Sequence, residues 1–248
     1  MLGLTLVIPA YNESLRLPRS LLLLKEALDL GAFSPLTLSE ILIIDDGSKD
    51  HTAEQTEELF RTTYSNLPQA RVIRNSFNRG KGHAVRTGLL AATQEWCLIS
   101  DADTATPWNQ IQPLYRVATE TQSSVAIGSR DVPGSNILTR QSWIREHMGK
   151  TFNFLVRMIT GLPFMDTQCG FKLVRIKDAK PWLHELSVDR FAWDVEFLML
   201  AKKHGLKISE VPVTWAHQDS SSVHPIKDSL EMLFRILQIR WRLVFHSK

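Results

Sequence analysis

The sequence predicts an α/β fold in which a mostly parallel β-sheet is flanked by helices. Short apolar runs alternate with longer stretches of helical character through the first half of the chain, a pattern typical of parallel strands joined by helices. Carboxylate pairs follow two of these runs, where the ends of parallel strands form a binding crevice. The length of 248 residues suits one α/β domain and is short for two.

The first half of the chain contains the apolar runs from which the sheet is expected. The expected strands are Leu4–Ile8, Ile41–Ile44, Ala70–Ile73, Trp96–Ile99 and Val125–Ile127. The helices expected between them are Ser20–Leu30, Thr52–Thr62, His83–Thr93 and Trp108–Thr121. Ser48 or Asp50 is expected to cap the second helix, because a short side-chain oxygen can accept a free backbone N–H there. This half has the pattern of a nucleotide-binding α/β unit.

The second half opens with a polar segment, Gly128–Lys150, that contains Pro133 and several arginines. The helices expected after it are Glu146–Thr160, Ala192–His204 and Ile226–Phe245, and the expected strands are Phe171–Ile176 and Lys207–Val213. We expect residues 1–225 to form one domain and residues 226–248 to form an amphipathic helix that packs on it or extends it.

Composition narrows the class of protein. The formal net charge is +3 and no basic stripe with interleaved aromatic residues occurs, so nucleic acid is not an expected partner. The two cysteines, Cys97 and Cys169, cannot form a disulfide framework, and no Cys/His spacing typical of a metal site occurs. The N-terminal residues lack the regions of a signal peptide, and no apolar stretch reaches the roughly 18 residues of a membrane-spanning helix. We therefore expect a cytoplasmic protein, soluble or peripheral on the inner face of a membrane.

Two carboxylate pairs are the sharpest chemical signal in the sequence. Asp45 and Asp46 follow one predicted strand, and Asp101 and Asp103 follow another. One residue separates Asp101 from Asp103, so on an extended segment their side chains point the same way. Such oxygen ligands suit Mg²⁺ or Mn²⁺, with diphosphate oxygens completing the shell. The alternative is that these residues only form turns or cap helices.

Two further segments offer groups for a nucleotide. Tyr11 could stack on a base and Glu13 could bond a polar edge of it, although an ordinary strand-to-helix turn is the favoured explanation when this segment is taken alone. Asn78–His83 supplies glycines and cations before a predicted helix, as phosphate sites often do. It lacks the GK[ST] ending of a phosphate-binding loop, and no G-x-G-x-x-G opens a helix, so a kinase or dehydrogenase is not supported.

Taken in order, these motifs resemble those of the family 2 inverting glycosyltransferases. The strings that carry the resemblance are Pro9–Glu13, Asp45–Ser48, Asn78–His83, Asp101–Asp103, Gly128–Arg130 and Asp166–Lys172. They are most similar to the branch of dolichyl-phosphate β-glucosyltransferases and dolichyl-phosphate mannose synthases. Asp166–Lys172, Phe191–Glu196 and Glu210–Trp215 look more like the glucosyl enzymes. The similarity runs from about Leu4 to the final helix.

The resemblance implies a GT-A type fold and the transfer of glucose from UDP-glucose to a polyprenyl phosphate, with Mg²⁺ or Mn²⁺ as cofactor and a membrane surface as partner. The products would be polyprenyl-phosphate glucose and UDP. Three alternatives stay open: a GDP-mannose-dependent mannosyltransferase, a family 2 transferase with a hydroxyl acceptor, and a non-catalytic nucleotide-sugar binding module. A hydroxyl acceptor needs a general base, whereas a phosphate monoester, with its second pKa near 6, is already largely anionic at neutral pH.

Roles for individual residues follow from the resemblance. The residues that would hold the nucleoside are Pro9, Tyr11, Glu13, Ile44 and Asp46. The residues that would hold the rest of the donor are Lys81, Asp101, Ala102 and Asp103, with Asp103 the principal metal ligand beside Asp101. Arg130 would bind the acceptor phosphate with Arg145 or Arg140, and Asp166 and Gln168 would line the sugar pocket. Asp103, Arg130 and Asp166 are the expected catalytic residues.

The sequence also departs from the family pattern. Ala105 occupies a position where mannose synthases carry a further metal ligand, and Ser222 occupies the position of a lysine that meets the donor. His224 and Lys227 are candidates to replace that cation. Asp194 and Glu196 are either catalytic or structural, and part of Phe152–Ile159 is expected to face lipid.

Overall fold

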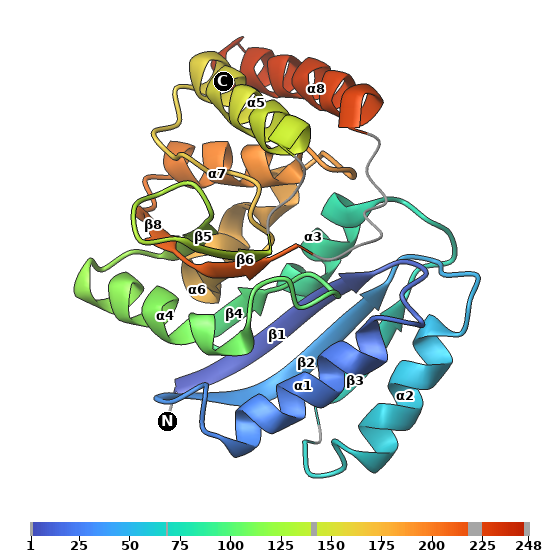
Figure 1. Cartoon of the computed structure of the whole chain (residues 1–248). Helices are drawn as coiled ribbons and strands as arrows, with labels where there is room; N and C mark the ends of the chain where they lie inside the picture. Colours follow the sequence, from blue (N-terminus) through green and yellow to red (C-terminus); the bar gives the residue numbers. More distant parts are fainter. Residues whose placement is uncertain (1, 68, 140–142, 218–224, 246–248) are drawn as a thin grey trace.

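The computed structural model describes residues 2–67, 69–139, 143–217 and 225–245. A seven-stranded sheet lies at its centre, with the strand order β3-β2-β1-β4-β7-β5-β8 (Figure 1). The strands are β1 (Leu2–Ala10), β2 (Leu36–Asp45), β3 (Ala70–Arg74), β4 (Trp96–Ile99), β5 (Val125–Ser129), β7 (Lys172–Arg175) and β8 (Ile208–Pro212). β7 runs antiparallel to β4 and β5, and the other neighbouring pairs are parallel. The mostly parallel α/β sheet predicted from the sequence is confirmed.

The helices lie close to their predicted positions. They are α1 (Leu17–Asp29), α2 (Thr52–Thr62), α3 (Lys81–Ala91), α4 (Ile111–Glu120), α5 (Trp143–Thr160), α6 (Ile176–Ala179), α7 (Trp193–Lys203) and α8 (Pro225–Phe245). The short α6 was not predicted. Of the two candidate caps of α2, Asp50 accepts a hydrogen bond from the Thr52 amide at 3.1 Å, whereas the Ser48 hydroxyl accepts from the Asn12 amide in another loop.

A second, two-stranded sheet was missed. The polar segment Gly128–Lys150 contains β6 (Asn136–Thr139), which pairs in parallel with β9 (Thr214–Ala216). These strands are short and mostly solvent-accessible, so neither carries the apolar run that marks a buried strand. Their pairing depends on the fold, because the partners are far apart in the sequence.

The sheet is buried on both faces. The side chains of Leu4, Leu6 and Ile8 enter one apolar cluster and that of Val7 enters the other, as the twofold alternation of a strand requires. α1 and α4 pack on the first face, and α3, α5, α7 and α8 contribute to the cluster on the second (Figure 1). This double burial is why the strands have nearly continuous apolar sequences.

α5 and α8 lie side by side as the outermost layer on the second face (Figure 1). Ile236 and Ile239 of α8 are buried in the core cluster below. Glu196 on α7 is also fully buried, and its carboxylate accepts hydrogen bonds from the Ser187 and Val188 amides and pairs with Arg242 of α8 at 2.5 Å. Glu196 therefore has a structural role. Within the described ranges, every helix is too short or too polar to span a lipid bilayer.

Candidate active site

A cleft of about 500 Å³ lies at the carboxyl ends of β1 and β4, where the sequence predicts a binding crevice. Cavities of this size are typical of small-molecule sites. The sequence-predicted residues that line it are Pro9, Tyr11, Glu13, Asp46, Lys81, Asp101, Ala102, Asp103, Arg130 and Gln168. They come from loops far apart in the sequence, and the sheet brings them together because its parallel strands end at one edge.

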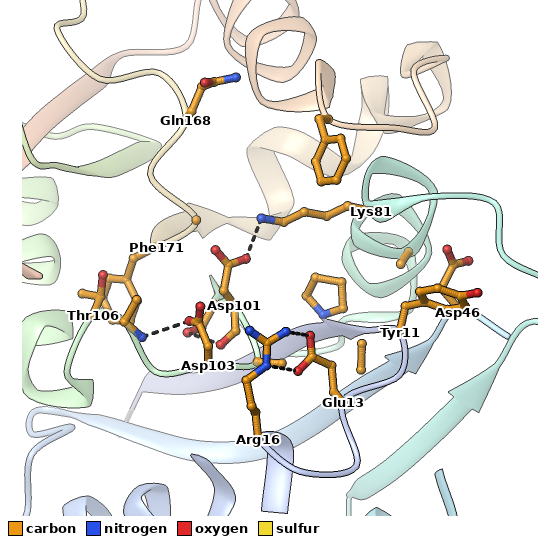
Figure 2. Close-up of a pocket in the computed structure, with 18 of the residues that line it drawn as sticks. Tyr11, Glu13, Arg16, Asp46, Lys81, Asp101, Asp103, Thr106, Gln168 and Phe171 are labelled. Atoms are coloured by element: carbon orange, nitrogen blue, oxygen red, sulfur yellow. Dashed lines mark hydrogen bonds and ion pairs between the residues drawn. The ribbon is translucent and has the colours of Figure 1, made fainter. Parts of the chain in front are cut away.

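Asp101 and Asp103 lie together at the floor of the cleft (Figure 2). The Lys81 ammonium, from the first turn of α3, lies 2.6 Å from Asp101 Oδ1. Partial burial raises the pKa of Asp101, but the charges of Lys81, Lys172 and Arg130 outweigh it, so the pKa lies below its usual range. Burial and the Asp101 charge raise the pKa of Asp103.

Gly170 provides the space that Asp101 occupies. A Cβ atom at this position would lie 2.2 Å from Asp101 Oδ2 and 2.5 Å from its carboxyl carbon. Both atoms belong to a short side chain that is already paired with Lys81, so a methyl group would displace the carboxylate. The glycine in the string Asp166–Lys172 is therefore required by close approach.

Glu13 lines the cleft near Asp103 and is held in a salt bridge. The Arg16 guanidinium binds both oxygens of Glu13, with Nε at 2.6 Å from Oε2 (Figure 2). Burial raises the pKa of Glu13, and the Asp103 and Asp101 charges act in the same direction. Tyr11 is 41% exposed at the mouth of the cleft, a position open to stacking.

Asp46 holds the loop that precedes α3. Its carboxylate accepts hydrogen bonds from the Gly80 amide at 2.6 Å, the Arg79 amide at 3.1 Å and the Asn75 side chain at 2.8 Å. Gly80 has φ 113°, and a Cβ there would meet the Asp189 carbonyl oxygen at 2.4 Å. Asp46 and Gly80 thus position the Lys81 end of α3 against the cleft.

Arg130 is held by a buried carboxylate behind the cleft wall. Asp166 is 0% exposed and does not line the cleft. It accepts from Arg130 Nε at 2.7 Å, from the second guanidinium nitrogen at 2.9 Å and from the Gln168 amide at 3.1 Å. The guanidinium also lies 5.5 Å from the centre of the Trp215 ring. Burial raises the pKa of Asp166, but Arg130 outweighs it, so the pKa lies below its usual range.

Lys172 and Asp194 form a second buried ion pair, besides that of Arg130 and Asp166. Lys172 is fully buried, donates to the Cys169 carbonyl at 2.5 Å, pairs with the Asp194 carboxylate and lies 5.3 Å from the centre of the Trp193 ring. Burial raises the pKa of Asp194 despite this partner. Asp194 does not line the cleft, so its position supports a structural role.

Other sequence-predicted residues lie elsewhere. Ile44 is fully buried in the core and does not line the cleft. Arg145 belongs to α5, but its side chain lies outside the described residues, as does that of Lys227. Arg140, Ser222 and His224 also lie outside the described residues.

Several lining residues were not predicted. They are Arg16, Thr106, Arg190, Phe191, Trp215 and His217. The spacing of three residues between Glu13 and Arg16 is a local signal for their salt bridge. The others reach the cleft from loops whose positions depend on the whole fold.

The carboxylates fit a divalent cation. Asp101 and Asp103 offer hard oxygen ligands. Burial first, and the Asp101 charge second, raise the pKa of Asp103, and a cation would offset both effects. Ala105, at the position of the third ligand in the mannose synthases, has no donor side chain. In the described part of the chain, no group of three acidic, histidine or cysteine side chains forms a metal site, so the substrate diphosphate would complete the shell.

A crevice at parallel strand ends that joins paired aspartates to basic side chains fits the binding of a phosphorylated ligand. The family model "Glycosyl transferase family 2" matches residues 5–181. The chain belongs to this family, and it is a glycosyltransferase.

Relatives of this chain are dolichyl-phosphate β-glucosyltransferases. The enzyme with that name from Dictyostelium discoideum is 36% identical over 96% of this chain and 74% of its own length. The Homo sapiens enzyme is 33% identical over 97% of this chain and 78% of its own length. The Saccharomyces cerevisiae enzyme is 33% identical over 96% of this chain and 74% of its own length.

Solved structures support the fold. Mannosyl-3-phosphoglycerate synthase from Rubrobacter xylanophilus superposes with a TM-score of 0.67 at 18% identity, over 100% of this chain and 76% of its own. Glucosyl-3-phosphoglycerate synthase from Mycobacterium tuberculosis was crystallised with Mn²⁺ and UDP-glucose. It superposes with a TM-score of 0.61 at 17% identity, over 97% of this chain and 78% of its own. These structures are GT-A type glycosyltransferases, which confirms the predicted GT-A fold.

Proposed function

We propose that this protein transfers glucose from UDP-glucose to a dolichyl-type polyprenyl phosphate, with inversion at the anomeric carbon. The observation that carries the proposal is the placement of the Asp101–Asp103 pair and of Arg130 in one cleft, with Arg130 held by a buried carboxylate. The aspartate pair, with a divalent cation, suits the leaving diphosphate, and Arg130 suits a phosphate nucleophile. Relatives named dolichyl-phosphate β-glucosyltransferase, at 33–36% identity over most of the chain, support the choice of sugar and acceptor.

The donor end of the cleft binds the nucleoside diphosphate. Tyr11 stacks on the base at the mouth, and Glu13, fixed by Arg16, bonds its polar edge. Asp103 and Asp101 would hold Mg²⁺ or Mn²⁺, which would supply charge stabilisation to the departing diphosphate. Lys81 lies within reach of the same phosphates, at the cleft end of α3.

The acceptor end needs no general base. An oxygen of the polyprenyl phosphate attacks C1 of the glucose, the bond between C1 and the diphosphate oxygen breaks, and UDP leaves. The nucleophile is already anionic at neutral pH, so Arg130 has only to orient it and reduce repulsion between two phosphate groups. Asp166 acts through Arg130, because it lies behind that guanidinium and outside the cleft.

The outer helices provide a surface for a membrane. Phe154, Leu155 and Met158 of α5 are 38–71% exposed. The large apolar residues of α8 that are more than half exposed are Leu230, Phe234, Leu237 and Trp241. An apolar helical face beside basic residues is typical of binding in the interface of a bilayer. We therefore propose that the protein binds the surface of the membrane that carries its acceptor.

The first experiment measures binding of UDP-glucose and of GDP-mannose by calorimetry, with and without Mn²⁺. We expect Mn²⁺-dependent binding of UDP-glucose alone; preference for GDP-mannose would refute the donor assignment. Turnover is then measured with polyprenyl phosphate and with free sugars as acceptors. Activity only on free sugars, with an acidic pKa in its pH profile, would instead indicate a hydroxyl acceptor and a general base.

Membrane binding is tested by flotation with anionic vesicles. The variant Phe154→Ser/Met158→Ser removes exposed apolar groups of α5. Phe77→Ser is the matched control, because Phe77 is also exposed but belongs to the loop before α3, where it lies with Tyr11 and Gly47. We expect the double variant to float less than the native chain and the control to float equally. A native chain that never floats would refute the membrane assignment.

A further inference from the structure

A second cavity of about 660 Å³ lies next to the candidate active site, between α8 and the loop that precedes α7. Its apolar lining includes Val188, Phe191, Met232, Ile239 and Trp241. Its charged lining consists of Arg79, Arg190, Arg235, Arg242, Asp189 and Glu231. The mixture of apolar surface and excess arginine suits an amphipathic anion.

The two cavities share a wall. Arg190 and Phe191 line both the cleft that holds Asp101 and Asp103 and the cavity under α8. A ligand that occupies the second cavity and contacts these two residues therefore lies against the wall of the cleft. This adjacency links the second cavity to the reaction.

The loop that carries Arg190 is firmly held. The Ser187 and Val188 amides bind the buried Glu196 carboxylate, and the Asp189 carboxylate binds Arg86 at 3.2 Å. The Asp189 carbonyl oxygen accepts from the His83 amide at 3.1 Å. The loop thus presents the side chain of Arg190 from a fixed backbone.

Some of the arginines that line this cavity are in ion pairs and others are not. Arg242 is paired with Glu196 at 2.5 Å, and Arg79 with Asp189 at 3.5 Å. Over the described residues, the Arg190 guanidinium makes no hydrogen bond or ion pair. Arg190 lines both cavities, and the cleft that it lines also contains Arg130.

We propose that the cavity under α8 holds the first isoprene units of the acceptor, while Arg190 binds its phosphate at the entrance to the cleft. This inference rests on the proposed function, because it names the path by which the acceptor reaches the donor. The acceptor phosphate contacts Arg190, which makes no hydrogen bond or ion pair with the described residues, and the isoprenoid tail lies along Phe191, Met232 and Ile239. The isoprenoid tail then leaves the cavity beside Trp241, at the exposed apolar face of α8.

The test compares acceptors of different length at saturating UDP-glucose and Mn²⁺. The short acceptor is citronellyl phosphate, with two isoprene units, and the long one is geranylgeranyl phosphate, with four. In the native chain the KM for the long acceptor should be lower, because its added units fill the cavity. Arg190→Gln should raise both acceptor KM values about tenfold, as loss of a charged hydrogen bond predicts, and change the KM for UDP-glucose less than twofold.

A cavity-filling variant distinguishes the contribution of the isoprenoid tail to acceptor binding from that of the phosphate. Gln238 lines the cavity from the exposed side of α8, so Gln238→Trp narrows it without altering the core. We expect this variant to raise the KM for geranylgeranyl phosphate more than the KM for citronellyl phosphate, because the longer acceptor occupies more of the cavity, and so to abolish the advantage of the long acceptor. Arg240→Gln is the matched control, since Arg240 is an exposed arginine of α8 that does not line the cavity.

Calorimetry with geranylgeranyl phosphate alone distinguishes this inference from the proposed function. Binding that is weakened by Arg190→Gln and Gln238→Trp, in a chain without glucosyltransferase activity, would support the cavity and refute the function. Turnover with acceptor KM values that neither variant changes would refute the cavity alone. An increase only in the KM for UDP-glucose on Arg190→Gln would also overturn it, because Arg190 would then bind the donor.

Discussion

Replacing Asp166 with asparagine tests the idea that this residue acts by holding Arg130. The change keeps the size of the side chain and removes its charge. The carboxylate accepts three hydrogen bonds from Arg130, at 2.7, 2.9 and 3.1 Å, and is 0% exposed. An asparagine has one acceptor oxygen and would turn its amide group toward a donor.

The size of the effect follows from the burial of the two partners. Removing one partner of a buried ion pair costs roughly 3–5 kcal/mol. The Arg130 side chain is 29% exposed, so water replaces part of the lost interaction and the lower end applies. We expect the free energy of unfolding to fall by about 3 kcal/mol, which lowers the Tm by roughly 6–12 °C for a chain of this size.

Thermal unfolding and steady-state kinetics measure the outcome. We expect Asp166→Asn to raise the acceptor KM and to leave the shape of the pH profile unchanged, because Asp166 transfers no proton. The double variant Arg130→Gln/Asp166→Asn should lose much less than the sum of the single losses, since both changes remove one interaction. Glu185→Gln is the control: it alters an exposed ion pair worth at most about 1 kcal/mol.

Two results would refute this reasoning. A Tm within 2 °C of the native value, together with an unchanged acceptor KM, would show that Asp166 does not hold Arg130. Loss of the acidic limb of the pH profile would instead show that Asp166 is a base. The pKa of Asp166 is lowered on folding, so its stabilisation is fully present above the unfolded value of about 3.9 and is lost only as the pH falls through the folded value. Measurements at pH 5–8 therefore see it undiminished.

Three further predictions concern the floor of the cleft. Asp103→Ala should abolish turnover and calorimetric Mn²⁺ binding, whereas Asp29→Ala, on the exposed end of α1, should change neither. Gly170→Ala should lower kcat/KM at least about 100-fold by displacing Asp101, while Gly149→Ala, whose added Cβ meets nothing within 4 Å, should leave kcat/KM unchanged; equal activity of the two variants would exclude the close approach. Because the pKa of Asp103 is raised, Mn²⁺ affinity should fall with decreasing pH at a midpoint above that of an ordinary aspartate; affinity constant down to pH 4 would contradict this.

The sequence predicts the parts of this fold that depend on local patterns. Continuous apolar runs predict the buried strands, and the residues that follow them predict which loops reach the cleft. Asp101 and Asp103 could be assigned to one site because they follow a strand end and lie one residue apart. Tyr11 and Lys81 could be assigned from the loops after other strands, since parallel strands share one binding edge.

The remaining features depend on contacts between distant residues. The direction of β7 has no local signal, because an apolar run has the same pattern in either direction. Asp166 was placed in the sugar pocket, but the pairing with Arg130, 36 residues earlier, puts it behind the wall. Arg190 carries no motif of its own, and its position follows from the contacts of Asp189 with α3.

The charges of the cleft give its specificity a physical basis. Three of its cations are already paired: Lys81 with Asp101, Arg16 with Glu13 and Arg130 with Asp166. A diphosphate that approaches Lys81 must compete with Asp101, whose negative charge repels it. Asp101 and Asp103 would lose that repulsion if they held a divalent cation, and Lys81 would then be free to turn toward the phosphates. In the proposed function, metal and donor would therefore bind cooperatively, and a neutral sugar without its diphosphate would gain nothing from this exchange.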